Sequence, residues 1–225
     1  PYITDVSNYL YDALAEKKNV MFEAQLGALR DIDFGIYPYT SSSTTLATYA
    51  PIGAGIPGVP VTDIVGIMKA YSTCVGEGPF TAEMFGEEAE RLRAAGGEYG
   101  AATGRPRRVG PFDVPASRYG VRMQGATRIA LTKLDVLSYM EKIPVCVAYE
   151  IDGVRTTDFP IGERLNRAKP VIEYLDGFGD VSKCRTYDSL PEAAKRYILY
   201  LEAAVGCWIE YVSVGAGRDE YIRFN

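Results

Sequence analysis

A lysine and an aspartate two residues apart follow an apolar stretch in the segment LTKLD, at Lys133 and Asp135. Guanine presents its N1–H and 2-amino groups side by side. An ionised carboxylate accepts from both donors, and adenine offers no matching pair. The aliphatic part of Lys133 can lie on the face of the purine. The alternative is a surface lysine followed by an aspartate that caps a helix, so the segment alone leaves guanine recognition open.

A glycine-containing segment, VSVGAGRD (212–219), follows another apolar stretch. Its small residues would let the backbone approach a base, with Ser213 and backbone N–H groups as donors. Glycine-rich turns between strands are common, so this segment alone predicts only a turn.

Three arginines lie within four positions of the segment GAATGRPRRVG (100–110), at Arg105, Arg107 and Arg108. The guanidinium fork binds carboxylates and phosphates through two parallel hydrogen bonds. A solvated loop is the alternative. In a chain of net charge −5, the clustering of three cations favours an anion site.

A polar run at residues 23–45 is rich in hydroxyls, small residues and backbone amides. Such a run could cradle a phosphate, although most runs of serine and threonine are plain polar loops. It lies within a stretch, 25–60, that is long for a connection, and long loops in compact domains are often functional. The chain contains no GxxxxGK[ST] segment, so the usual phosphate loop is absent.

Periodicity and capping residues predict the elements that would position these segments. Helices are expected at 4–18 (capped by Thr4 or Asp5), 61–70, 81–97, 113–126 (capped by Asp113), from 134 onward, and 190–206. Strands are expected at 19–24, 71–75, 128–133 and 170–175, in a hairpin over 143–159 that turns at Asp152-Gly153, and as two short strands within 207–224. The alternation predicts a single α/β domain with a largely parallel sheet flanked by helices and a small antiparallel hairpin. Ligands bind such sheets at the carboxyl ends of the strands.

Composition excludes several classes of protein. A net charge of −5 and a pI near 5.0 argue against general binding to nucleic acid or anionic membranes. The sequence has no histidine, so no imidazole base or ligand comes from this chain. Its four cysteines form no CxxC pair, which disfavours zinc and suggests free thiols. No apolar run approaches about 18 residues, so no membrane span is expected.

Taken together, five segments in this order resemble adenylosuccinate synthetase. They cover nearly the whole chain: FEAQLG with DIDFGIYPYTSSS, KAYSTCVGEGPF, EYGAATGRPRR, LTKLDVL and VSVGAGR. The resemblance implies a P-loop-like synthetase fold and a ligase that joins IMP and L-aspartate, using GTP and Mg²⁺. GTP would phosphorylate O6 of IMP, and the amine of aspartate would then displace the phosphate, giving adenylosuccinate.

The resemblance also assigns residues to ligands. For GTP they are Lys133, Leu134, Asp135, Ser213, Val214, Gly215 and Arg107. For L-aspartate they are Ala101, Ala102, Thr103, Gly104 and Arg105, with Thr103 and Arg105 holding the carboxylates. For IMP they are Gln25, Leu26, Ser41 and Arg105.

The chain departs from the family pattern in several places. FEAQLG replaces the usual FEGAQG, so that the glutamine that contacts IMP aligns with Leu26 while Gln25 lies one residue away. Ala102 replaces a threonine, Asp33-Phe34-Gly35 replaces DHG, and Gly215-Ala216-Gly217-Arg218 replaces GPDR.

The family's N-terminal phosphate loop, GDEGKGK, is also missing, together with the aspartate and histidine that act in catalysis. We therefore expect residues 1–225 to be the C-terminal half of a synthetase about twice as long, with no catalytic residue and no metal ligand in this chain. The half alone is expected to be inactive, and the complete enzyme to be a cytoplasmic homodimer. The alternative is a noncatalytic module or fragment that binds a guanine nucleotide.

Overall fold

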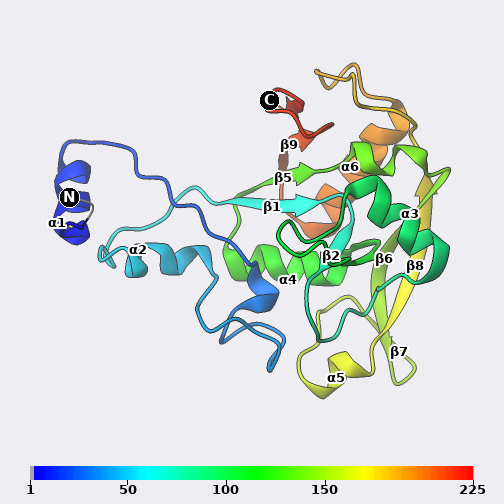
Figure 1. The fold of residues 1–225 in the computed structure, drawn as a ribbon, viewed down its shortest axis with the longest axis horizontal. Coiled ribbons are helices and arrows are strands. Elements are labelled where there is room, and N and C mark those ends of the chain that lie inside the picture. The colour runs from blue at the N-terminus through cyan, green and yellow to red at the C-terminus, as the bar shows by residue number, and fades with distance from the viewer. Residues whose placement is uncertain (1–2, 225) are drawn as a thin grey trace.

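The computed structural model describes residues 3–224, which form an α/β fold with two mixed sheets flanked by helices (Figure 1). The predicted fold class is confirmed. Two helices, α4 (Val114–Gln124) and α6 (Glu192–Val205), pack against each other, and α4 also contacts both sheets. As predicted, the Asp113 side chain caps α4 by accepting from the N–H of Ala116 at 3.0 Å. Gly206, in the left-handed conformation, ends α6.

The first sheet has the strand order β1-β5-β9-β10. Its strands are β1 (Val65–Lys69), β5 (Arg128–Thr132), β9 (Ile209–Ser213) and β10 (Tyr221–Arg223). The first three are parallel, although β1 was not among the predicted strands, and β10 runs antiparallel to β9. Consequently the carboxyl ends of β1, β5 and β9, at Lys69, Thr132 and Ser213, lie along one edge of the sheet.

Alternating burial explains why β5 forms a strand at the centre of the core. Ile129 and Leu131 are buried, while Arg128, Ala130 and Thr132 are only half-buried. Full burial of an isoleucine or leucine side chain stabilises the fold by about 1.5–3 kcal/mol. This strand is therefore a firm support for the segment that follows it.

The second sheet is larger than the predicted hairpin. It contains β4 (Phe112–Asp113), β6 (Lys142–Ile151), β7 (Val154–Thr156) and β8 (Lys169–Asp176). The hairpin of β6 and β7 turns at Asp152-Gly153 as predicted, and both residues have a positive φ. In addition, β8 pairs antiparallel with β6 along nearly its whole length.

Two short strands, β2 (Ser72–Cys74) and β3 (Arg108–Gly110), form an antiparallel pair. The end of the segment 100–110 is therefore a strand, although we predicted a loop throughout. The predicted helix at 81–97 is shorter, α3 (Gly86–Gly96), because Phe85 is still extended. The predicted helix after Lys133 is a 3₁₀ helix, η3 (Asp135–Tyr139).

Two predicted elements were wrong. Residues 61–70 contain the strand β1 and no helix, because pairing with β5 outweighs a local pattern that suits either structure. Residues 19–24 form no regular structure, and Met21 is 89% exposed. A strand needs a partner, and none pairs with this segment within residues 3–224.

The N-terminal region extends away from the sheets (Figure 1). Its first helix, α1 (Val6–Ala15), begins after Asp5, which accepts from the N–H of Asn8 at 3.1 Å, as predicted. The long polar stretch contains only η1 (Ala28–Arg30), η2 (Ala47–Tyr49) and α2 (Ala50–Gly53), and one further short helix, α5 (Glu163–Asn166), follows β7. Throughout residues 3–224, every helix is too short or too polar to cross a membrane.

Candidate functional site

The two segments predicted to contact guanine lie side by side at the carboxyl edge of the first sheet. The N–H of Lys133 donates to the Ser213 hydroxyl at 2.9 Å, and the N–H of Leu134 donates to the Ser213 carbonyl at 3.2 Å. Lys133 has a φ of 62°, a left-handed conformation that is uncommon for a residue with a side chain. The chain therefore turns sharply at the end of β5 and bonds to the end of β9.

Asp135 lies at the start of η3 with its side chain half-buried. Partial burial raises the pKa of its carboxyl above the ordinary value, and the carboxylates of Glu220 and Asp180 add to this effect, while Lys133 opposes it. The Lys133 ammonium, two residues away, donates to the Gly96 carbonyl and to Glu98 rather than to this carboxylate. The Asp135 carboxylate thus keeps acceptor capacity for a ligand.

The turn after Ser213 is closed by Glu220. The N–H of Val214 donates to the Glu220 carbonyl at 2.9 Å, and the N–H of Gly217 donates to the Glu220 carboxylate at 2.6 Å. A Cβ at Gly215 would collide with that carboxylate. A side chain at position 215 would therefore displace the Glu220 carboxylate, which accepts from Gly217 in this turn.

Residues 98–107 form a loop held together at its neck. The N–H of Arg107 donates to the Glu98 carbonyl at 2.9 Å, and the N–H of Gly100 donates to the Arg105 carbonyl at 2.8 Å. The tip is exposed and comprises the predicted aspartate-binding residues Ala101, Ala102, Thr103, Gly104 and Arg105. The loop thus presents backbone amides and one arginine to solvent from a fixed base.

A buried carboxylate that we did not predict, Glu98, links this loop to the guanine segments. It is 0% exposed and accepts from Lys69 at 2.8 Å, Arg107 at 2.9 Å and Lys133 at 3.0 Å. The Tyr71 hydroxyl also donates to it, at 2.5 Å. Burial alone would raise its pKa, but the hydrogen bonds from Lys69, Tyr71 and Lys133 outweigh burial and lower the pKa to about 2. The carboxylate is therefore ionised at neutral pH.

The sequence held a weak signal for Glu98. It directly precedes the arginine-containing loop, and Lys69 and Lys133 both follow apolar stretches. Only the pairing of β1 with β5 brings the two lysines to one edge.

The predicted IMP residues lie in a separate part of the chain, the polar stretch near η1. Gln25 and Leu26 are exposed, and Leu26 has a φ of 74°. Ser41 is half-buried, and its N–H donates to the Arg30 carbonyl at 2.8 Å. Within residues 3–224, hydrogen bonds join the guanine and aspartate segments to each other but not to Gln25, Leu26 or Ser41.

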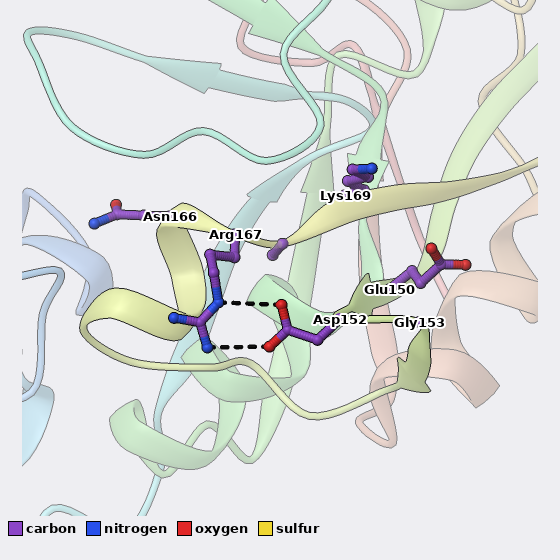
Figure 2. Close-up of a pocket in the computed structure, with 7 residues that line it drawn as sticks. Glu150, Asp152, Gly153, Asn166, Arg167 and Lys169 are labelled. Carbon is purple, nitrogen blue, oxygen red and sulfur yellow. Dashed lines mark hydrogen bonds and ion pairs between the residues drawn. The ribbon is translucent and has the colours of Figure 1, made fainter.

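A surface hollow at the hairpin of the second sheet is a poor candidate for the functional site (Figure 2). It is lined by Glu150, Asp152, Arg167 and Lys169, among others, and by none of the predicted site residues. The Arg167 guanidinium points to the Asp152 carboxylate and bonds to it at 3.1 and 3.2 Å (Figure 2). Arg167, at the end of α5, is thus already paired with the turn of the hairpin.

Residues that could hold a metal ion do not gather in the part of the chain that the structure describes. No three side chains of histidine, cysteine, aspartate or glutamate cluster within residues 3–224.

Comparison with known proteins decides the family. The sequence model of the family named adenylosuccinate synthetase matches residues 1–222. The chain belongs to the adenylosuccinate synthetase family. The resemblance of its motifs is thereby confirmed.

Individual relatives agree with this assignment. Adenylosuccinate synthetase of Cutibacterium acnes is 47% identical over 227 residues, which cover 100% of this chain and 53% of the relative. The fully ligated adenylosuccinate synthetase from Plasmodium falciparum superposes with a TM-score of 0.94 at 38% identity, covering 99% of this chain and 54% of the other. The chain thus spans about half the length of these adenylosuccinate synthetases.

A more distant structure shares the fold alone. Cyanophage S-2L succinoaminodeoxyadenylate synthetase, bound to dGMP and dATP, has a TM-score of 0.58 at 15% identity. It covers 96% of this chain. This likeness extends the fold beyond the adenylosuccinate synthetases of similar sequence.

Proposed function

We propose that this chain carries the guanine-reading and aspartate-binding parts, and some of the IMP-binding part, of an enzyme that ligates IMP and L-aspartate with GTP. Phosphorylation of O6 of IMP by GTP would create a leaving group, and the amine of aspartate would displace it. The chain would act by holding the three substrates in line, since correct positioning alone can lower such a barrier by about 7–11 kcal/mol.

The observation that carries this proposal is the hydrogen bond between Lys133 and Ser213. Their hydrogen bond of 2.9 Å aligns the two segments, so that Asp135 and the Val214–Gly215 backbone can approach one base. Leu134 is fully buried and anchors the first segment. Asp135 would accept from N1–H and the 2-amino group of guanine, and the lysine stem would cover its face.

The loop 98–107 would bind L-aspartate. Thr103 and Arg105 lie at its exposed tip, where the guanidinium could hold a carboxylate through two hydrogen bonds. Ala101 and Ala102 would contribute backbone donors, while the N–H of Gly104 donates to the Gly100 carbonyl at 2.8 Å and holds the loop closed. Arg107, which pairs with Glu98 at 2.9 Å, would face the GTP side. Arg105 would also reach IMP.

The remaining IMP contacts would come from Gln25, Leu26 and Ser41. Ser41 replaces a threonine of the family, and either residue offers a hydroxyl to a phosphate. Leu26 is 61% exposed and has no polar group, so we assign any side-chain contact in FEAQLG to Gln25.

We further propose that residues 1–225 form one α/β domain and the C-terminal half of a longer cytoplasmic synthetase that works as a homodimer. The length of the relatives supports a synthetase about twice as long, since the chain covers 53% of the one from Cutibacterium acnes. Mg²⁺ and the acid–base groups would be held by the other half. Residues 1–225 alone would therefore turn over no substrate.

The test is steady-state turnover by the product of the complete gene. We expect adenylosuccinate to form only when IMP, GTP and L-aspartate are all present, and residues 1–225 alone to be inactive. GDP binding without ligation by the complete product would instead identify a noncatalytic guanine-nucleotide module. Turnover by residues 1–225 alone would contradict their assignment as a recognition half.

A substitution tests the loop separately. Arg105→Leu removes one bidentate partner of a carboxylate, so the KM for L-aspartate should rise about tenfold or more while the KM for GTP stays nearly constant. Normal aspartate kinetics would refute the assignment of Arg105.

A further inference from the structure

Glu98 is the one residue of the described chain whose carboxylate touches both the guanine segment and the loop 98–107. Its Oε1 accepts from Lys133 at 3.0 Å, and its Oε2 accepts from Arg107 at 2.9 Å. The carboxylate is 0% exposed and lies beneath both segments. Neither substrate could reach it directly, so any effect on them must pass through its partners.

The surroundings hold the Glu98 carboxylate in one place. Lys69 donates to both of its oxygens, at 2.8 and 3.0 Å, from the end of β1, and the Tyr71 hydroxyl donates at 2.5 Å. A Cβ at Gly96 would collide with that hydroxyl, so the end of α3 is shaped to admit Tyr71. A shift of Glu98 would therefore disturb several elements together.

The two segments have few other rigid connections to each other. Lys133 also donates to the Gly96 carbonyl at 2.6 Å, which ties it to the end of α3 just before the loop. The tip of the loop, residues 101–106, is exposed. The buried Nε of Arg107 has no hydrogen-bond partner within residues 3–224. The orientation of Arg107 thus depends strongly on its bond to Glu98.

We propose that Glu98 is a positioning residue that couples recognition of GTP to recognition of L-aspartate. It orients Lys133 on one side and Arg107 with the base of the aspartate loop on the other. Coupling between sites can be carried by a contiguous network of ion pairs, and Glu98 is the shared member of the network that joins Lys133 to Arg107. This inference rests on the proposed function and adds a residue to it.

The test uses the complete gene product and Glu98→Gln, which keeps the shape of the side chain and removes its charge. We expect the KM values for GTP and for L-aspartate to rise together, each about tenfold, with a smaller change for IMP. Glu210→Gln is the matched control. Glu210 is 1% exposed and accepts from Arg128 and Arg223, but it contacts neither segment. This control should lose stability and keep both KM values within about twofold.

A double-mutant cycle distinguishes coupling from a general loss of order. Lys133→Met should raise the KM for L-aspartate severalfold in the wild-type background and have little further effect beside Glu98→Gln. If the Glu98→Gln variant does not fold, Tyr71→Phe is the substitute test. It removes one neutral donor to Glu98 and should raise both KM values about two- to threefold.

The outcomes separate the two claims. A wild-type product that makes no adenylosuccinate would refute the proposed function. Normal wild-type turnover, with KM values for GTP and L-aspartate that Glu98→Gln or Tyr71→Phe leaves unchanged, would overturn the coupling role alone. Additive effects of Lys133→Met and Glu98→Gln on aspartate would overturn it as well.

Discussion

Two buried carboxyl groups, those of Glu98 and Asp113, have pKa values that are shifted in opposite directions. Glu98 is surrounded by three cations and a tyrosine hydroxyl, and its pKa falls to about 2. Asp113 is 4% exposed and, among residues 3–224, its side chain accepts only from the Tyr149 hydroxyl at 2.6 Å and the N–H of Ala116. Burial raises its pKa to about 6 despite these two bonds.

The difference matches the helix-capping role of Asp113 and the positioning role that we propose for Glu98. Asp113 caps a helix and supports Tyr149 between two layers, a task that needs hydrogen bonds and no charge. Around Glu98, three positive charges face one negative charge at the carboxyl edge of the first sheet, the edge at which parallel sheets generally bind ligands. An excess of positive charge suits anionic substrates such as nucleotides and aspartate.

The largest expected effect is on the Glu98 cluster itself. Glu98→Gln should lower the free energy of unfolding at pH 7 by about 3 kcal/mol, because three cations lose their buried counter-charge and the pKa shift spans about 2.5 units. Urea unfolding of the wild type and the variant measures this change. A loss below about 1 kcal/mol would mean that the cluster is not a stabilising unit.

The pH dependence should run in opposite directions for the two groups. A carboxyl with a lowered pKa stabilises the fold above its unfolded pKa, so the contribution of Glu98 should be lost as the pH falls from about 4.5 to about 2. A carboxyl with a raised pKa favours the folded state when protonated. Asp113 should therefore stabilise the fold increasingly as the pH falls from about 6 to about 3.8.

Asp113→Asn tests the second half of this contrast. At pH 7 the free energy of unfolding should change by less than about 1 kcal/mol, because relief of a buried charge offsets the weaker bond to Tyr149. Between pH 7 and pH 4 the wild type should gain about 2 kcal/mol relative to the variant. Parallel stability curves for the two proteins over this range would show that Asp113 is already neutral or unshifted.

The smallest effect is expected at Lys69. Burial lowers the pKa of Lys69 more than the nearby Glu98 raises it, so the site disfavours the charged form of this lysine. Lys69→Met should therefore change the free energy of unfolding by less than about 1 kcal/mol, since Lys133 and Arg107 still face Glu98. Thermal and urea unfolding measure this change. A loss of stability larger than about 1 kcal/mol would mean that Lys69 supplies most of the stabilisation of the cluster.

Local patterns predicted the elements whose signals are strong. The cap at Asp113, the turn at Asp152-Gly153 and the end of a helix at Gly206 were all predicted and confirmed. The strand β1 was mistaken for a helix because its identity depends on pairing with β5, 63 positions away in register. Long-range pairing leaves little trace in a short window of sequence.

The same reason explains what was missed at the site. The segments around Lys133 and Ser213 could be predicted as candidate guanine contacts from their residue types. In the structure the N–H of Lys133 donates to the Ser213 hydroxyl at 2.9 Å. Glu98 by itself gave no signal of a functional role, because a glutamate before a loop usually faces solvent. Its burial follows from the convergence of β1, β5 and the loop, which only the tertiary fold determines.

The most direct test of the account is the base specificity of Asp135→Asn in the complete gene product. An asparagine would oppose a donor to the 2-amino group of guanine but match the 2-oxo group of xanthine. We predict that the KM for GTP rises about 100-fold, that for xanthosine triphosphate falls, and that for IMP stays nearly constant. An unchanged KM for GTP would contradict the assignment of residues 133–135 and 213–215 as the guanine site.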